Sequence, residues 1–137
     1  MARLLYAPYL VLYLRWEADY PQEWGAPDSR MWSPWGTKEV LLRRLDRGGV
    51  PEQVQPQICD LIVSAIERPY RCKDWMYARL VRHVVNTPFV SRIEALLDAD
   101  DPLVRLRAQF ILHVVRHPRH VVKRVSWQRW LSSDADT

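Results

Sequence analysis

The chain has 137 residues, of which 48% are hydrophobic and 26% are charged. This length and balance are typical of one globular domain with a substantial core, and they argue against a disordered chain. The net charge of +4 is unevenly spread, with a net −1 over residues 1–70 and a net +7 over residues 71–131. Most basic residues are Arg, so a GC-rich coding bias is an alternative origin of this charge.

The first predicted element covers residues 4–18. Its apolar run LLYAPYLVLYL is too short to span a bilayer as a helix, and no small-residue cleavage site follows it. Alternation of Tyr9, Val11 and Tyr13 with leucines would suit a buried strand, whereas the Leu-rich composition favours a helix. We expect a buried helix; a strand and a membrane or export segment are the alternatives.

Residues 19–36 form a predicted loop, because prolines and glycines interrupt every apolar pattern there. The loop carries Trp24, Trp32 and Trp35. A long aromatic loop either folds onto the core or binds a partner. We expect residues 1–36 to form an aromatic-rich N-terminal cap.

From residue 37 the pattern is helical. Thr37 is a predicted N-cap for a helix that ends at Gly48 and Gly49. Pro51 opens the next predicted helix, which Pro56 would kink and Pro69 would end. Short, proline-marked connections predict antiparallel neighbours. The expected helices are 4–18, 38–47, 51–68, 71–86, 88–98, 102–117 and 118–133.

An internal repeat supports this organisation. At an offset of thirty residues, Ala78 aligns with Ala108, His83 with His113, and Pro88 with Pro118. Self-similarity at this period is typical of stacked helical hairpins, in which each hairpin covers the apolar face of the next. The LLDAD segment at 96–100 is echoed by SSDAD at 132–136, so residues 132–137 are expected to be a polar tail.

A proline-led helix start, DDPLVR, occupies residues 100–105 and is followed by Ala108. This segment resembles the first helix of HEAT-like repeats of the short type, about thirty residues long. In that family the Asp caps the helix, the Val and Ala pack between repeats, and the Arg bonds to a neighbouring repeat. The resemblance covers residues 71–131 and is partial before residue 100, where Arg71 and Trp75 replace the Asp and the Arg. The matching residues are Asp101, Pro102, Leu103, Val104, Arg105 and Ala108.

This resemblance implies an all-α fold of stacked antiparallel helix pairs. We therefore expect a single domain over 1–137, with a HEAT-like α-solenoid of about three pairs at 37–131. The family is defined by its shape and hosts many functions, so no catalytic residue is carried over.

No residue pattern predicts catalysis or a cofactor. His113 and His117 have the i, i+4 spacing that can hold a metal, and His120 lies close by. Pro118 interrupts the helix, however, and no Cys, Asp or Glu accompanies them, so we expect interior polar or helix-end positions and no metal. Cysteines outside any metal-binding spacing suit a reducing, cytoplasmic setting.

The basic segment RHPRHVVKRVSWQRW is the candidate binding face. In a helix from Pro118, Arg119 and Lys123 would lie one turn apart, while Val121, Val122 and Val125 would pack inward. Arg and Trp suit both phosphate backbones and protein interfaces. A solvated face whose tryptophans close the core is the alternative. The predicted binding residues are Arg105, Arg116, Arg119, Lys123, Arg124, Trp127 and Trp130.

The leading hypothesis is a non-enzymatic interaction module that binds a protein partner through this basic, Trp-bearing face. Nucleic-acid binding through the same face is the first alternative. A small enzyme, or a carrier of an aromatic ligand between Tyr9, Tyr13, Trp24 and Trp35, is the second. We expect no membrane partner, and a homodimer is compatible with an exposed end of the array.

Overall fold

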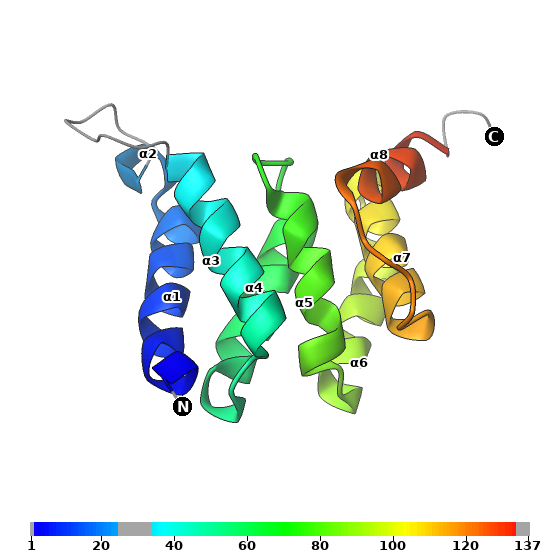
Figure 1. The fold of residues 1–137 in the computed structure, drawn as a ribbon. Helices are drawn as coiled ribbons and strands as arrows, with labels where there is room; N and C mark the ends of the chain where they lie inside the picture. Colours follow the sequence, from blue (N-terminus) through cyan, green and yellow to red (C-terminus); the bar gives the residue numbers. More distant parts are fainter. Residues whose placement is uncertain (1, 25–33, 134–137) are drawn as a thin grey trace.

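The computed structural model describes residues 2–24 and 34–133. Within these two ranges the chain forms helices and loops, with no strand (Figure 1). The all-α prediction is therefore confirmed. Residues 25–33 of the Trp-rich loop and residues 134–137 of the polar tail lie outside the described residues.

The N-terminal element is a helix, α1 (Ala2–Asp19), which excludes the strand alternative. Ala7, Val11 and Leu14 are buried, and their spacing places them on one helical face, whereas Tyr9 and Leu12 are exposed. A short helix, α2 (Pro21–Trp24), follows. The next helix, α3 (Pro34–Gly48), begins three residues before Thr37. The predicted Thr37 cap is therefore wrong: a proline starts the helix, where its missing N–H costs nothing.

The remaining elements keep the predicted order with changed bounds. Pro56 lies in the first turn of its helix, so the predicted kink is wrong: the N–H that proline lacks would have no partner at this position. The helix expected at 71–86 is reduced to a 3-10 turn and a two-turn helix. The elements are η1 (Glu52–Val54), α4 (Gln55–Glu67), η2 (Asp74–Met76), α5 (Tyr77–Val84), α6 (Thr87–Ala95), η3 (Leu96–Asp98), α7 (Pro102–Arg116) and α8 (Arg124–Ser133).

Side-chain caps fix two helix starts. Asn86 Oδ1 accepts a hydrogen bond from the Phe89 N–H at 2.8 Å, and Asp101 Oδ1 accepts one from the Leu103 N–H at 2.9 Å. The Asp101 cap is the one that the family resemblance implied. Arg105 donates to the Ala99 carbonyl in the preceding loop.

The helices lie in two layers (Figure 1). α1, α4 and α6 form one layer, in which α4 contacts both others, and α3, α5 and α7 form the second, in which α5 contacts both others. The chain crosses from one layer to the other at each step. Buried side chains such as Ile58, Ile62, Leu80 and Phe110 form a core that runs through both layers.

A bond between helices ties the layers together. Arg107 is 3% exposed, and its Nε donates to the Ile66 carbonyl near the end of α4 at 2.7 Å. The contact to a neighbouring hairpin that the resemblance assigned to Arg105 is thus made from α7 by Arg107, while Arg105 holds its own preceding loop.

The helix predicted at 118–133 is wrong in its first six residues. Residues 117–123, here called the connection, make a turn at Pro118 and Arg119 and then run extended, so α8 begins only at Arg124. The connection is held because Val122 is 4% exposed in the core and its carbonyl accepts from Arg79 Nε at 2.9 Å. Arg119 and Lys123 therefore do not share a helical face.

The valine pattern changes with this connection. Val122 is buried as expected, but Val121 and Val125 are 68% and 48% exposed and do not pack inward. Val121 and Val122 are adjacent in the connection, and an extended segment alternates its side chains between faces, so only one of the two can point to the core. Val125 lies in the first turn of α8, on an exposed side of that helix.

None of the helices in the described ranges combines the length and the apolar content needed to cross a bilayer.

Candidate functional site

The predicted basic residues lie on three successive parts of the chain: α7, the connection and α8. Arg105 is half-buried at the start of α7, and Arg116 is exposed at its end. Arg119 and Lys123 are exposed on the connection, and Arg124 is exposed at the start of α8. The structure therefore does not bring these residues together on one helical face.

The two predicted tryptophans belong to the packing of α8. Trp127 is 3% exposed, and its ring lies 5.6 Å from the Phe110 ring and 5.9 Å from the Tyr70 ring, measured between centroids. Trp130 is half-buried against Phe110 and His113. Trp127 thus closes the end of the core, and only Trp130 has a surface that a partner could contact.

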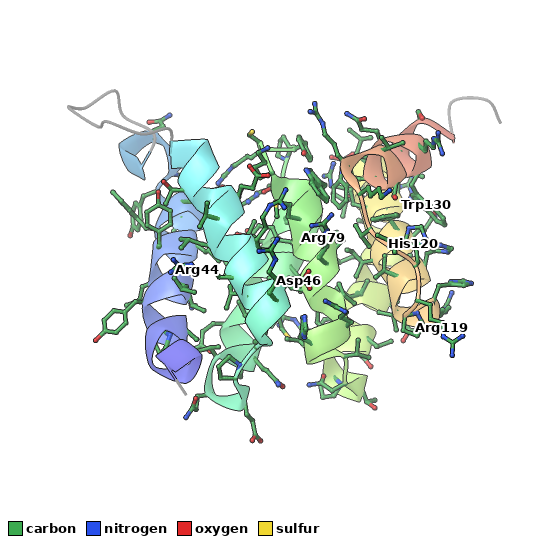
Figure 2. The ribbon with its side chains drawn as sticks, in the orientation of Figure 1. Arg44, Asp46, Arg79, Arg119, His120 and Trp130 are labelled. Carbon is green, nitrogen blue, oxygen red and sulfur yellow. The ribbon has the colours of Figure 1, made fainter. Side chains whose placement is uncertain are left out.

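The connection instead brings Arg119 beside arginines of α5. Together they line a groove of about 220 Å³, here called the α5 groove. Figure 2 places Asp46 on α3, Arg79 on α5, and Arg119 and His120 on the connection. The groove is lined by Asp46, Ala78, Arg79, Arg82, Val114, Pro118, Arg119, His120, Val121 and Val122.

Arg79 is the most constrained cation of the α5 groove. Its Nε donates to the Val122 carbonyl at 2.9 Å, and its guanidinium carbon lies 4.8 Å from the centroid of the Trp75 ring. Both contacts fix the plane of the guanidinium. Within the described ranges, neither terminal nitrogen of Arg79 has a hydrogen-bond partner.

The single carboxylate of the α5 groove is already paired. Asp46 Oδ1 accepts from Arg82 Nη2 at 2.8 Å and lies 3.1 Å from His83 Nε2. Arg82 is therefore largely neutralised. The positive charge that remains in the groove comes from Arg79 and Arg119.

A histidine cluster lies beside the α5 groove at the end of α7. The His113 and His117 rings stack at 4.2 Å, and the His120 ring meets His113 edge-on at 5.5 Å. Stacked rings do not converge on one point, and the described residues contain no group of three ligands that could hold a metal. Burial, followed by the charges of His117 and His120, lowers the pKa of His113.

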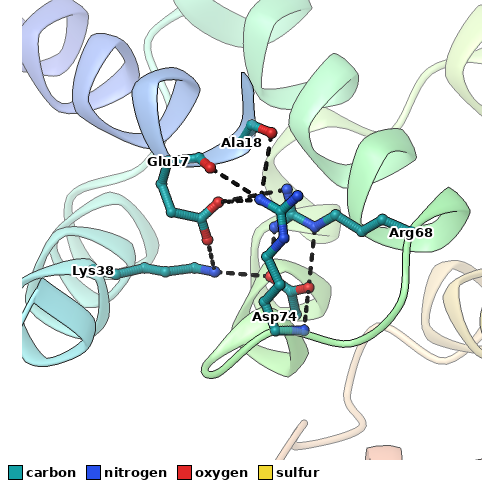
Figure 3. A network of polar contacts seen from close by, with 6 residues as sticks. Glu17, Ala18, Lys38, Arg68 and Asp74 are labelled. Atoms are coloured by element: carbon teal, nitrogen blue, oxygen red, sulfur yellow. Dashed lines mark hydrogen bonds and ion pairs between the residues drawn. The ribbon is translucent and has the colours of Figure 1, made fainter. Parts of the chain in front are cut away.

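A network of buried charges joins α1, α3, the end of α4 and η2, and no pattern in the sequence predicted it (Figure 3). Lys38 Nζ donates to the carboxylate of Glu17 and, at 2.8 Å, to Asp74 Oδ1. The side chains of all three residues are fully buried. No substrate can reach them, so the network serves the fold. Its members are Glu17, Lys38, Arg68, Arg71 and Asp74.

Two arginines complete the network. Arg68 Nη2 donates to Asp74 Oδ1 at 2.6 Å, and Arg71 Nη1 donates to Glu17 Oε2 at 2.8 Å. Burial disfavours the charged form of Arg68, but the hydrogen bond and charge of Asp74 outweigh it and raise the pKa of Arg68. The partners of Lys38 lie 21 and 36 residues away in sequence, so no local pattern marks the network.

A second pocket, of about 450 Å³, lies between α4 and α6 and includes Cys59. Burial raises the pKa of the Cys59 thiol, which therefore stays protonated at neutral pH. Arg92 at the rim pairs with Asp60 at 2.9 Å. Cys59 is therefore not an activated nucleophile, and among the described residues the unpaired charge in the lining of this pocket is the carboxylate of Glu52.

Comparison with known proteins yields no relative from which a function could be inferred: no protein-family model, no curated protein and no solved structure matches this chain.

Proposed function

We propose that this protein is a non-enzymatic interaction module, an α-solenoid of HEAT-like helix pairs that binds a protein partner in the α5 groove. The alternation of the chain between two layers supports the solenoid. So does the capping of α7 by Asp101, together with Ala108, which is fully buried at the position that the family packs between repeats.

The observation that carries this proposal is the charge of the α5 groove. Arg79, Arg82 and Arg119 converge there from two elements, and the only carboxylate is already paired. A concave surface with uncompensated positive charge attracts and orients an acidic partner. Relative to the sequence analysis, the binding face moves from α8 to α5, and Arg119 is common to both.

The walls of the groove favour a protein over a nucleic acid. Pro118 and Val121 are exposed and contribute apolar surface to the groove. A phosphate backbone would leave this apolar surface uncovered, whereas a protein segment can bury it. Nucleic-acid binding is therefore the alternative outcome of the test.

The test is affinity capture of the full chain from its native host, with and without nuclease, followed by titration of the identified partner at several salt concentrations. The double variant Arg119→Glu, His120→Glu changes exposed positions of the groove and is expected to lose the partner. The matched control Arg124→Glu, Arg129→Glu changes exposed positions of α8 outside the groove and is expected to retain it.

Two results would overturn the proposal. Loss of all captured material on nuclease treatment, with a steep fall of affinity as salt rises, would indicate nucleic-acid binding. A partner that survives the groove variant but is lost in the α8 control would return the binding face to the C-terminal helix.

A further inference from the structure

We infer that Arg79 is the anchor of the α5 groove and that it binds an Asp or Glu side chain of the partner, next to an apolar side chain held by the connection. This inference rests on the proposed function and specifies the chemistry of the partner segment.

The orientation of Arg79 is fixed before any ligand binds. A guanidinium carries five N–H donors in a planar fork, and here the Nε–H is used on the Val122 carbonyl. The Trp75 ring supports one face of that plane. The two terminal nitrogens thus keep donors for an oxygen pair, and a carboxylate accepts two parallel hydrogen bonds from such a fork.

Pre-organisation makes this arginine a better anchor than its neighbours. A flexible surface arginine loses side-chain entropy when it binds, whereas Arg79 has already lost most of it. Arg82 is engaged with Asp46, and Arg119 is exposed on the connection. Arg119 therefore adds positive charge that attracts an acidic partner to the groove, and Arg79 donates the oriented hydrogen bonds to its carboxylate.

The apolar side of the groove specifies the residue next to the carboxylate. Val121 is 68% exposed and lies on the same groove as Arg79, together with Pro118. A leucine-like side chain beside the acid would cover this surface. The volume of about 220 Å³ is below the range of about 300–1,000 Å³ that is typical of small-molecule sites, so it suits one or two side chains.

The probe is the tripeptide N-acetyl-Leu-Asp-Leu-amide, titrated into the isotope-labelled full chain and followed by NMR. Saturable shifts are expected at the Arg79 side chain and at the backbone amides of residues 119–122. The Asn counterpart of the peptide should bind at least about tenfold more weakly, because it lacks the charge that strengthens the hydrogen bonds.

Three variants separate the two subsites. Arg79→Lys keeps the charge but not the fork, and should weaken the Asp peptide about tenfold. Val121→Ser should weaken binding of the Asp peptide. In a parallel titration with acetate, which carries the carboxylate without the apolar side chains, this variant should show the same shifts as the parent. Arg129→Lys, on the exposed side of α8, is the matched control and should bind like the parent. Far-UV circular dichroism and unchanged amide signals of buried residues outside the groove, such as Leu14 and Ile62, check that each variant keeps the fold.

Equal binding of the Asp and Asn peptides, or an Arg79→Lys variant that binds as the parent does, would overturn the inference. Stronger saturation of the same amides by inorganic phosphate or oligothymidylate would also overturn it, in favour of a phosphate ligand. If Arg79→Lys keeps the captured partner while the Arg119→Glu, His120→Glu variant loses it, the inference fails and the proposed function stands. If instead nuclease treatment abolishes capture of the partner, the proposed function itself is contradicted.

Discussion

At the scale of single residues, the buried charges have the largest energetic consequence. Lys38, on α3, bonds to Glu17 of α1 and to Asp74 of η2, so one ammonium group ties together three elements that are distant in sequence. A buried ion pair contributes little net stability compared with apolar packing, but removing one partner leaves an uncompensated buried charge.

Asp74→Asn is therefore expected to lower the free energy of unfolding by about 3–5 kcal/mol, because Lys38 and Arg68 lose their shared carboxylate. Urea denaturation measures this change. Glu39→Gln is the control: Glu39 pairs with Arg43 and Lys73 at the surface, and its loss should cost at most about 1 kcal/mol. Equal costs for the two variants would mean that the network is open to solvent.

His113 should make stability depend on pH. Burial and the charges of His117 and His120 lower its pKa below the usual value of 6.5, so the unfolded chain binds a proton at a higher pH than the folded chain does. The contribution of His113 to stability is complete above the unfolded pKa of about 6.5, and it is lost as the pH falls through the lower pKa of the folded chain. We expect the urea concentration at the unfolding midpoint to increase as the pH is raised from about 5.5 to about 7.5.

The comparison variant for this pH effect is His113→Gln, in which the rise should be smaller. Proton NMR titration of the imidazole signals gives an independent check. If the titration gives His113 a pKa above that of a histidine in an unfolded peptide, the expected direction of the shift is contradicted.

At the scale of elements, local signals predicted most of the helical segments, but they missed the short helix α2 within the predicted loop and misplaced several helix starts. The helical assignment of residues 4–18, the Asp101 start of α7 and the Pro69 stop of α4 all follow from short-range chemistry. The start of α8 does not. Pro118 is a good first residue for a helix, yet a long-range contact of Val122 with the core and with Arg79 keeps the connection extended.

Adjacent valines of the connection should therefore respond differently. Val122→Ala is expected to lower the free energy of unfolding by about 1–2 kcal/mol, because it removes buried methyl groups beside the core. Val121→Ala should change it by less than about 0.5 kcal/mol, because Val121 is exposed. Chemical denaturation of both variants tests the assignment, and a larger cost at Val121 would support the helix that the sequence predicts.

At the scale of the whole molecule, the two layers share one core. α4 and α5 lie at its centre, and α5 contacts α3 on one side and α7 on the other. The charge network joins the N-terminal helices to η2, and Trp127 closes the opposite end. These couplings favour one cooperative unit over helix pairs that unfold separately.

Leu80→Ala, at a fully buried position of α5, is expected to cost about 2–5 kcal/mol and to preserve a single unfolding transition. Tryptophan fluorescence and far-UV circular dichroism, followed in the same denaturant series, should give coincident curves. Separate midpoints would show that the hairpins unfold independently, as in a long repeat array.

Periodicity, capping residues and charge composition were enough to establish an all-α chain, the order of its helices and a basic second half. These properties depend on residues a few positions apart, which interact in any helix. The site depends on pairs such as Arg79 and Val122, which are 43 residues apart, and on the burial of Trp127. Only the packing of the layers brings such residues together, because the energy that holds the connection extended comes from contacts that no local pattern encodes.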